Sequence, residues 1–500
     1  MIIRLKVKSF KNLVDVDVRF GPFTCVAGVN GVGKSNLFDA IRFLSALASR
    51  PLIEAALSIR AEGGSASDLR NLFHRIGGNY TDRMSFEVEM IVPPEAVDDL
   101  GQTGKATNTM LRYSLELGYC GDKNNSTSPG SLEILKEELS HIKKSEAGKH
   151  LLFKHSTKDW RDTVVRAGRR VPYFISTADD GDARIIKLHQ DGGGSRGKPL
   201  PHSASNLPRT VLSAANAAES PTVLCARREM ESWRILQLEP SALRMPDEIN
   251  APSHLTLNGG HLPATLYRLA QTPFGNIENG MSKRDPEFIF TKVANRLSTL
   301  IGDVSRVWVD RDDRREILTL QVIGKDGTEH PARSLSDGTL RFLALSVIEL
   351  DTIAKGVLCL EEPENGIHPE RIPAMLQLLQ DIAIDPNERV DETNPLRQVI
   401  VNTHSPAVVS EVPDASLLVA ETKEDIRDGQ RFNKVIFACL SNTWRTKAPE
   451  ETFIVSKGKL LVYLNPASPP QHRAKRSANR VVDRDDLQMF FPGWEERING

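Results

Sequence analysis

The stretch Phe23-Thr-Cys-Val-Ala27 is short and apolar, and it runs directly into Gly28-Val-Asn-Gly-Val-Gly-Lys-Ser35. The first part has the composition of a buried strand. From about Asn36 a helix is expected, because its apolar residues recur at helical spacing; these are Leu37, Ala40, Ile41 and Leu44. A strand, a GxxxxGKS loop and a helix in this order predict a phosphate-binding loop.

The chemistry of phosphate binding explains the residue types in this loop. Glycines allow backbone N–H groups to surround phosphate oxygens, and the N-terminus of the following helix adds partial positive charge. Lys34 is expected to reach the β- and γ-phosphates of a nucleotide, and Ser35 is expected to bind Mg²⁺. The loop residues expected to hold the nucleotide are Asn30, Gly31, Gly33, Lys34, Ser35 and Asn36.

A second motif places acids at the end of a predicted strand. The apolar run Val357-Leu-Cys-Leu360 ends in Glu361-Glu362. Glu361 is expected to hold Mg²⁺ through its water shell, and Glu362 to polarise the attacking water. Taken alone, the same residues would fit an exposed acidic turn after a core strand equally well, but the phosphate-binding loop upstream favours the catalytic interpretation.

Two further motifs indicate a nucleotide site only in combination with the first two. Leu335-Ser-Asp-Gly-Thr339 precedes a predicted helix; alone, it indicates an ordinary N-cap by Ser336 or Asp337. His404 follows the apolar run Val399-Ile-Val401 and could face a γ-phosphate, although a single histidine after a strand is more often structural.

The remaining pattern predicts how the chain is organised. Strands are expected at residues 2–8, 14–18, 84–92, 110–119 and 357–360, a hairpin at 304–310 with 316–323, and helices at 285–301, 337–354 and 372–383. Residues 131–144 are polar and helix-like, whereas 176–210 are rich in Gly, Pro and Ser and predict loops or a flexible insertion. Strands that alternate with helices predict an open, mostly parallel α/β sheet.

The composition limits the number of structural units and the class of protein. The chain has 500 residues, enough for two to four structural units, and a formal net charge of -1, which excludes coating of nucleic acid by bulk charge. Its five cysteines form no CxxC pair, and no run of about 18 apolar residues occurs, so a reducing cytoplasmic location without a membrane span is expected.

The order of the motifs resembles ATP-binding-cassette ATPases of the RecF, SMC and OLD type. The resemblance is specific over residues 1–45 and 330–410, with Ser9-Phe-Lys-Asn12 and the phosphate-binding loop in the first range. In the second, Glu361-Glu-Pro-Glu-Asn-Gly-Ile-His-Pro369 resembles the OLD-like ATPases in particular. This resemblance implies an ABC-type ATPase head, with a mostly parallel sheet, an antiparallel β subdomain and a mixed helical insertion.

The resemblance also implies roles for single residues. Two heads would form a homodimer, or a higher homo-oligomer, and enclose two ATP molecules. One chain would supply the loop and Glu362, and the other would supply the signature Ser336 and Gly338. His404 matches the switch histidine, and Lys11 takes the place where relatives often carry an arginine near the phosphates.

Some positions depart from the family pattern. The signature is LSDGT rather than LSGGQ, and Glu361 replaces the usual aspartate. No glutamine occurs between Lys34 and Ile91 to act as the usual metal ligand of the Q-loop, and no aromatic residue is marked for stacking on adenine.

The C-terminal region gives little support for nuclease chemistry. OLD nucleases carry a metal-binding Toprim domain, but only about a hundred residues follow His404, and the strand at 459–463 ends without an acid. Asp483 and Asp485 lie in a charged tail. Its basic residues Arg473, Lys475, Arg476 and Arg480 are either a solvated charge run or a contact for nucleic acid or a partner.

Four functions are therefore open: a regulatory ATPase of a prokaryotic antiphage system, a RecF-like DNA-repair ATPase, a transporter subunit and a self-contained nuclease. The signature, the long insertion and the missing acids disfavour the last two. The first would act with a separately encoded effector, like the ATPases of Septu-type systems, and DNA is a further candidate partner. The expected domains are 1–120 and 300–445 for the split head, 121–299 for an inserted lobe with flexible loops, and 446–500 for the tail.

Overall fold

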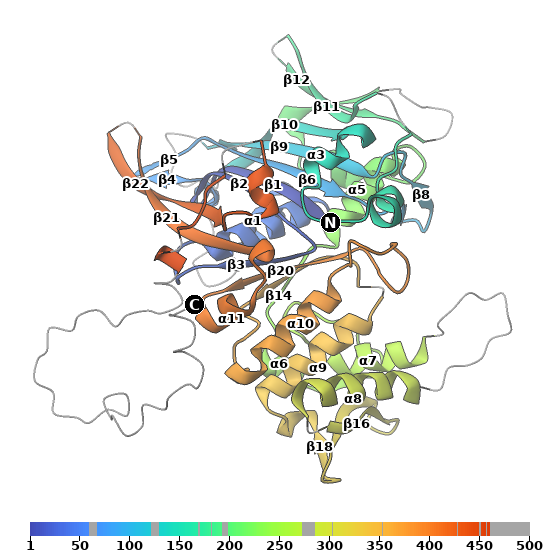
Figure 1. The fold of residues 1–500 in the computed structure, drawn as a ribbon. Coiled ribbons are helices and arrows are strands. Elements are labelled where there is room, and N and C mark those ends of the chain that lie inside the picture. Colours follow the sequence, from blue (N-terminus) through green and yellow to red (C-terminus); the bar gives the residue numbers. More distant parts are fainter. Residues whose placement is uncertain are drawn as a thin grey trace, which may run out of the picture. The chain divides into compact units, whose positions relative to one another are not determined.

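The computed structural model describes residues 1–59, 68–121, 130–168, 171–181, 183–192, 199–272, 286–302, 304–352, 354–427, 429–449, 452–456 and 458–460 (Figure 1). The chain divides into two compact units, Met1–Ser456 and Lys457–Gly500. Every helix and strand described below belongs to the first unit. The basic and acidic tail residues named above, between 473 and 485, lie outside the described residues.

A six-stranded sheet carries the predicted motifs. Its order is β14 (Arg234–Leu236), β19 (Gly356–Glu361), β20 (Arg397–Thr403), β3 (Phe23–Ala27), β21 (Leu417–Arg427) and β22 (Gln430–Cys439). The first five strands are parallel, and β22 pairs antiparallel with β21 at one edge. The predicted open, mostly parallel sheet is therefore confirmed.

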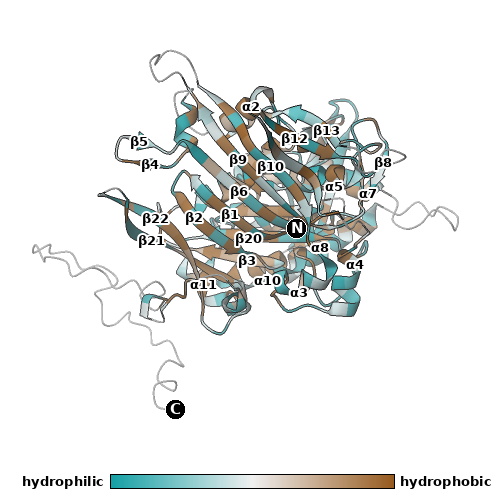
Figure 2. Cartoon of the chain, turned by 90° about the horizontal axis from the view of Figure 1, so that it is seen from above, coloured by the Kyte–Doolittle hydropathy of each residue, from teal (hydrophilic) through white to brown (hydrophobic). Residues whose placement is uncertain are grey.

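An eight-stranded antiparallel sheet forms a second layer. Its order is β13 (Pro199–Ser203), β12 (Ala183–His189), β11 (Tyr173–Asp180), β10 (Ser131–His141), β9 (Met110–Cys120), β6 (Arg83–Ile91), β1 (Ile2–Phe10) and β2 (Leu13–Arg19). Hydrophilic and hydrophobic residues alternate along its strands, as expected for a sheet with one covered face (Figure 2).

Two expectations about this sheet are wrong. Residues 131–144 are not a helix, because strand β10 occupies Ser131–His141 and pairs with β9 along its whole length. Glutamate and lysine favour a helix in isolation, but pairing with β9 and burial of one face override that preference. Residues 176–210 were expected to be loops, yet their described part includes most of the β11–β12 hairpin and β13.

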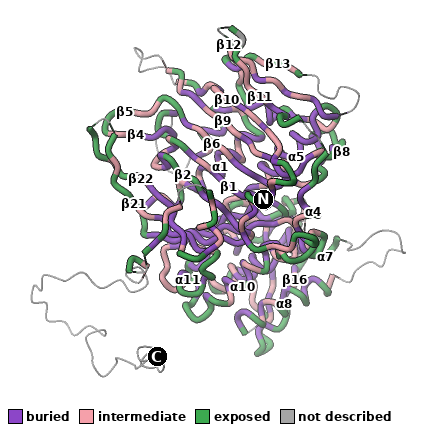
Figure 3. Tube along the Cα trace, turned by 45° about the horizontal axis from the view of Figure 1, so that its top comes forward, coloured by how far each residue is buried: buried purple, intermediate pink, exposed green. Residues whose placement is uncertain are grey.

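Helix α1 (Lys34–Leu47) lies in the core between the two sheets. Its buried Leu37, Ile41 and Leu44 share one cluster of buried apolar residues with strands of both sheets. The Phe43 ring packs on Phe10 and Phe86 of the antiparallel sheet, with ring centroids 5.9 and 5.7 Å apart. In Figure 3, the tube along α1 and the adjoining strand β1 is mostly in the colour of buried residues.

A helical layer and a small sheet form another part of the unit. The helices are α7 (Leu262–Gln271), α8 (Glu287–Ile301), α9 (Asp337–Leu350) and α10 (Ile372–Ile382). The small sheet contains β15 (Asp247–Glu248), β16 (Val304–Asp312), β17 (Ile317–Gly324) and β18 (Glu329–Pro331). The hairpin β16–β17 and helices α8, α9 and α10 lie where the sequence predicted them. None of the described helices is long and apolar enough to span a bilayer.

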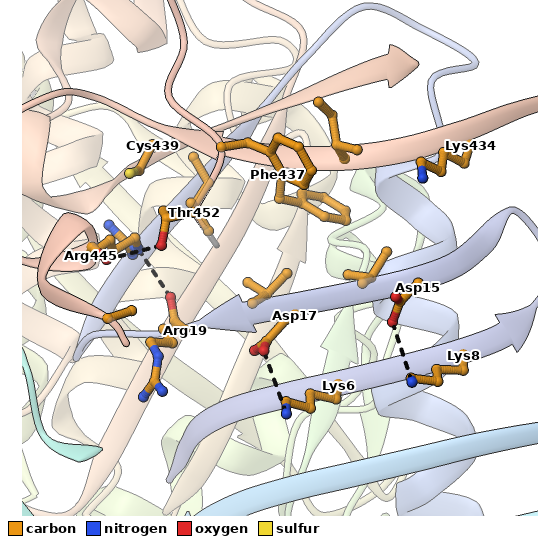
Figure 4. Close-up of a pocket in the computed structure, with 16 residues that line it drawn as sticks. Lys6, Lys8, Asp15, Asp17, Arg19, Lys434, Phe437, Cys439, Arg445 and Thr452 are labelled. Carbon is orange, nitrogen blue, oxygen red and sulfur yellow. Dashed lines mark hydrogen bonds and ion pairs between the residues drawn. The ribbon is translucent and has the colours of Figure 1, made fainter. Parts of the chain in front are cut away.

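The two sheets also approach each other along β2 and β22, around a hollow of about 410 Å³ (Figure 4). Lys6 and Asp17 form one ion pair in it, at 3.8 Å, and Lys8 and Asp15 form another, also at 3.8 Å. Arg445 donates to the carbonyl oxygen of Arg19 at 3.0 Å. Since these charges pair with one another or with the backbone, the hollow contributes to the junction of the sheets.

Glu137 in β10 ties the antiparallel sheet to the segment that leads toward β14. Its buried carboxylate accepts N–H bonds from Val211 at 2.8 Å and Leu212 at 2.9 Å, and a bond from the Tyr113 hydroxyl at 3.2 Å. Burial raises the pKa of Glu137 to about 7, against the lowering effect of these hydrogen bonds. The neighbouring hydroxyl of Thr210 donates to the Leu47 carbonyl at the end of α1.

We predict that Glu137→Ala lowers the free energy of unfolding by about 2–4 kcal/mol, because two buried N–H groups lose their acceptor. The control is Glu138→Ala, the next residue on the other face of the strand, whose ion pair with Lys136 is partly exposed. It should change stability by less than about 0.5 kcal/mol. Denaturant unfolding followed by fluorescence measures both, and equal effects would contradict the assigned role of Glu137.

Candidate nucleotide-binding site

The carboxyl ends of the parallel strands β3, β19 and β20 meet at one cavity of about 440 Å³. The predicted site residues that line it are Asn30, Gly31, Gly33, Lys34, Ser35, Asn36, Glu361 and Glu362. Other lining residues are Asn12, Gln237, Leu238, Glu239, Pro240, Arg341, Asn365 and Asn402. The fold therefore brings the glycine-rich loop and both strand-end acids together, although more than 300 residues separate them in the sequence.

Asn12 fixes the shape of the glycine-rich loop. Its amide donates to the Val32 carbonyl at 3.2 Å, and its carbonyl accepts from the Asn36 amide at 2.7 Å. Gly33 has a φ of 110°, and a Cβ at this position would lie 2.2 Å from the Asn12 amide nitrogen. The loop therefore requires glycine here for two reasons, the backbone conformation and the close approach of Asn12.

Lys34 begins helix α1 and points back into the loop. Its ammonium donates to the Gly28 carbonyl at 2.6 Å and to the Val29 carbonyl at 3.0 Å. Burial lowers the pKa of Lys34, although the charges of Glu362 and Glu364 act against this. The ammonium and the helix N-terminus together make this part of the cavity suitable for phosphate.

Glu362 is held in an unusual backbone conformation. Its φ is +44°, and its N–H donates to both the backbone and the side-chain oxygen of Asn402, each at 3.1 Å. Its carboxylate accepts from the Asn365 amide at 2.9 Å and lies 2.6 Å from Nδ1 of His404. Such strain in a polar cavity is typical of functional positions.

These contacts also set the ionisation of Glu362. Burial disfavours the charged form, but the hydrogen bonds from Asn365 and His404 and the charge of Lys34 outweigh it, so the pKa of Glu362 is lowered. An ionised carboxylate at the rim of a phosphate site can accept a proton from water.

The structure places the remaining predicted residues outside the set that lines the cavity. His404 does not line the cavity but contacts Glu362, which does. Lys11 forms an ion pair with Asp39. Ser336 is exposed and accepts from the N–H of Thr339 at 3.2 Å as the N-cap of α9. Gly338, in the first turn of this helix, lies close to the carbonyl of Gly366. One chain therefore does not bring Ser336 to its own loop.

Sequence reasoning missed Gln237. It follows β14, which pairs with β19, so its position matches the strand-end position of Glu361 one strand away. No glutamine lies between Lys34 and Ile91, and the structure supplies one to the cavity from a distant part of the chain. The signal was weak because β14 has only three residues.

Glu364 was also missed. It is buried, and its carboxylate accepts from the Thr403 hydroxyl, which in turn accepts from the N–H of Ser405 at 2.9 Å. Burial raises the pKa of Glu364, and the charge of Glu362 adds to this. Glu364 therefore connects the acidic turn after β19 to the end of β20.

The donors around the loop suit a magnesium ion. Ser35, Glu361 and Gln237 offer hydroxyl, carboxylate and amide oxygens, which are the ligands that Mg²⁺ prefers. The described residues contain no cluster of three or more His, Cys, Asp or Glu that could hold a metal by itself.

We predict that Gly33→Ala reduces nucleotide affinity at least about tenfold, since the added methyl group displaces Asn12 and distorts the loop. Gly101→Ala is the matched control. Gly101 also has a positive φ, of 80°, but a Cβ there meets no atom within 4 Å, and it does not line the cavity. Calorimetric titration with ATP measures both variants, and an affinity of Gly33→Ala as high as that of Gly101→Ala would contradict the role of Asn12.

Comparisons with known proteins agree with this geometry. A family model described as "AAA domain, putative AbiEii toxin, Type IV TA system" matches residues 23–104 and 239–410, just over half of the chain. The chain is 25% identical over 297 residues to the DNA replication and repair protein RecF of Clavibacter sepedonicus, covering 57% of this chain and 70% of that protein. It is 34% identical over 80 residues to RecF of Porphyromonas gingivalis, covering 16% and 22%.

Among solved structures, an Smc head bound to the C-winged helix domain of ScpA is similar, with a TM-score of 0.43 and 15% identity, covering 88% of this chain and 98% of that one. The SMC head domain from Thermotoga maritima has a TM-score of 0.36 and 10% identity, covering 88% and 99%. The family match spans both the loop and the strand-end acids. Because this match covers just over half of the chain, the chain belongs to the family described as an AAA domain.

Proposed function

We propose that the chain hydrolyses ATP with Mg²⁺ at the cavity beside Lys34. The observation that carries this proposal is the meeting of Lys34, Ser35, Glu361 and Glu362 in one cavity of about 440 Å³. The loop from Asn30 to Asn36 would surround the phosphates with backbone N–H groups. Mg²⁺, held by Ser35 and Glu361, would supply charge neutralisation at the phosphate oxygens.

Glu362 is the proposed general base. Its carboxylate is kept ionised and is oriented by Asn365 on one oxygen and His404 on the other. It would take a proton from the water that attacks the γ-phosphorus, while Lys34 holds the departing and transferred phosphates. His404 acts through Glu362 in this scheme and is therefore a positioning residue.

The second half of the proposal is a site shared by two chains. Ser336 is exposed at the start of α9 and lies outside the set of residues that line its own cavity. A serine at the N-terminus of a 14-residue helix offers a hydroxyl and backbone N–H groups to an anion. We infer that Ser336 and Gly338 meet the ATP of a second chain, so that the active form is a homodimer or a higher homo-oligomer.

At the cellular level we propose a regulatory subunit of a prokaryotic antiphage system that controls a separately encoded nuclease or toxin. The description of the matching family names a toxin of a type IV toxin–antitoxin system, which supports a role in such systems. The OLD-like acidic motif and the resemblance to Septu-type ATPases support it as well. A RecF-like ATPase that binds DNA in repair is the second candidate, supported by the two RecF relatives.

Co-purification with the products of neighbouring genes distinguishes the two candidates. A stable complex with a nuclease or toxin supports the first, and ATP-dependent binding of DNA by the purified chain supports the second. In both cases the chain alone is expected to hydrolyse ATP without cutting DNA or RNA, and metal-dependent cleavage that survives Glu362→Gln would contradict both.

We predict that Glu362→Gln slows ATP hydrolysis about 10²–10⁴-fold without loss of ATP binding, because an amide keeps the shape but cannot accept the proton. ATP should then remain bound, and light scattering should show a doubled mass. Lys34→Ala should instead lose ATP binding in calorimetry, since the phosphates lose a charge-assisted contact. Glu370→Gln changes an exposed acid eight positions along the chain from Glu362, and it should behave like the wild type.

A further inference from the structure

Arg341 is a cationic side chain in the nucleotide cavity to which neither the motifs nor the proposed function give a role. It lies on α9 and lines the cavity together with Lys34, Glu361 and Glu362. Its Nε is buried and has no hydrogen-bond partner among the described residues. A buried guanidinium donor without an acceptor is costly, and the cavity that this side chain lines has room for an anion beside the guanidinium.

Each acid near Arg341 makes a contact with another group. Asp337, one turn earlier on α9, forms an ion pair with Arg244, which also donates to the Leu335 carbonyl at 3.0 Å. Glu364 accepts from Thr403 through Oε1, whereas its Oε2 is buried and has no hydrogen-bond partner among the described residues. Burial lowers the pKa of Arg341, and the charges of Asp337 and Glu364 only partly oppose this.

The position of Arg341 indicates which anion would suit it. Lys34 marks the β- and γ-phosphate end of the cavity, and the acids after β19 mark the place of the attacking water. A planar guanidinium can donate two parallel hydrogen bonds to a phosphate group. A terminal phosphate at this end would give the guanidinium of Arg341 an acceptor in the cavity.

We propose that Arg341 binds the γ-phosphate of the ATP held by its own chain and so couples that site to Ser336. This inference rests on the proposed function. Both residues belong to the same helix: Ser336 caps it and Arg341 follows in its second turn. A helix is stiff over this distance, so a contact that draws Arg341 toward one ATP also sets the position of Ser336 against the other. ADP lacks the γ-phosphate and would leave both residues unengaged.

The first test compares affinities for ATP and ADP by calorimetry with Mg²⁺ present. Arg341→Gln should weaken ATP binding about tenfold or more and ADP binding less than about threefold, because only ATP offers the γ-phosphate. Arg333→Gln is the control: Arg333 is exposed, precedes the same helix and does not line the cavity. Equal losses for both nucleotides, or no loss, would overturn the proposal.

The second test measures the coupling in the Glu362→Gln background. With saturating ATP, the Glu362→Gln chain should double its mass, whereas the chain that also carries Arg341→Gln should stay a monomer despite bound ATP. Doubling in both would overturn the coupling. If Arg341→Gln does not fold, Arg341→Lys replaces it: the shift of the ATP-to-ADP affinity ratio, at an unchanged melting temperature, then decides.

The two proposals fail separately in these experiments. Lys34→Ala, measured in the same titrations, tests nucleotide binding itself: if it still binds ATP, the proposed function is wrong. If it loses ATP while Arg341→Gln keeps the wild-type ratio of affinities, only the inference about Arg341 is wrong.

Discussion

Helix α1 is packed between two sheets, and the rest of the site depends on this position. Its apolar face joins strands of the parallel and the antiparallel sheet in one core, so the helix cannot move without disturbing both. Its N-terminus is therefore held at the carboxyl ends of β3, β19 and β20, where the glycine-rich loop begins. Asn12, from the turn between β1 and β2, completes the constraint by fixing the loop from the side of the antiparallel sheet.

The site assembled at this point combines local and distant contributions. Lys34 and Ser35 come from the start of α1, whereas Glu361, Glu362 and Gln237 come from the ends of neighbouring parallel strands. Hydrogen bonds from Asn365 and a contact with His404 hold Glu362 in its strained conformation. Arg341 and Ser336 belong to one helix. Arg341 lines this cavity, whereas Ser336 is exposed to solvent.

Sequence patterns predicted the parts of this arrangement that depend on neighbouring residues. The loop at 28–35 and the acids at 361–362 are each marked by a strand that precedes them, and the parallel sheet follows from the alternation of elements. The sequence does not indicate Gln237, because only the pairing of the three-residue β14 with β19 brings it to the site. The charged residues of strand β10 favour a helix, and the pairing with β9 that overrides this preference involves a separate stretch of sequence.

The central claim is that each ATP lies between the loop of one chain and Ser336 of another, and mixing two inactive variants tests it most directly. Lys34→Ala chains lack a functional loop, and Ser336→Arg chains lack a functional signature, so each alone should be inactive. In a mixed dimer one site carries both defects and the other carries neither. The account predicts that an equal mixture recovers up to about a quarter of wild-type ATPase activity, since half of randomly formed dimers are mixed and each has one intact site of two. No recovery, although the chains exchange, would contradict a shared site and indicate an ATPase that works within one chain.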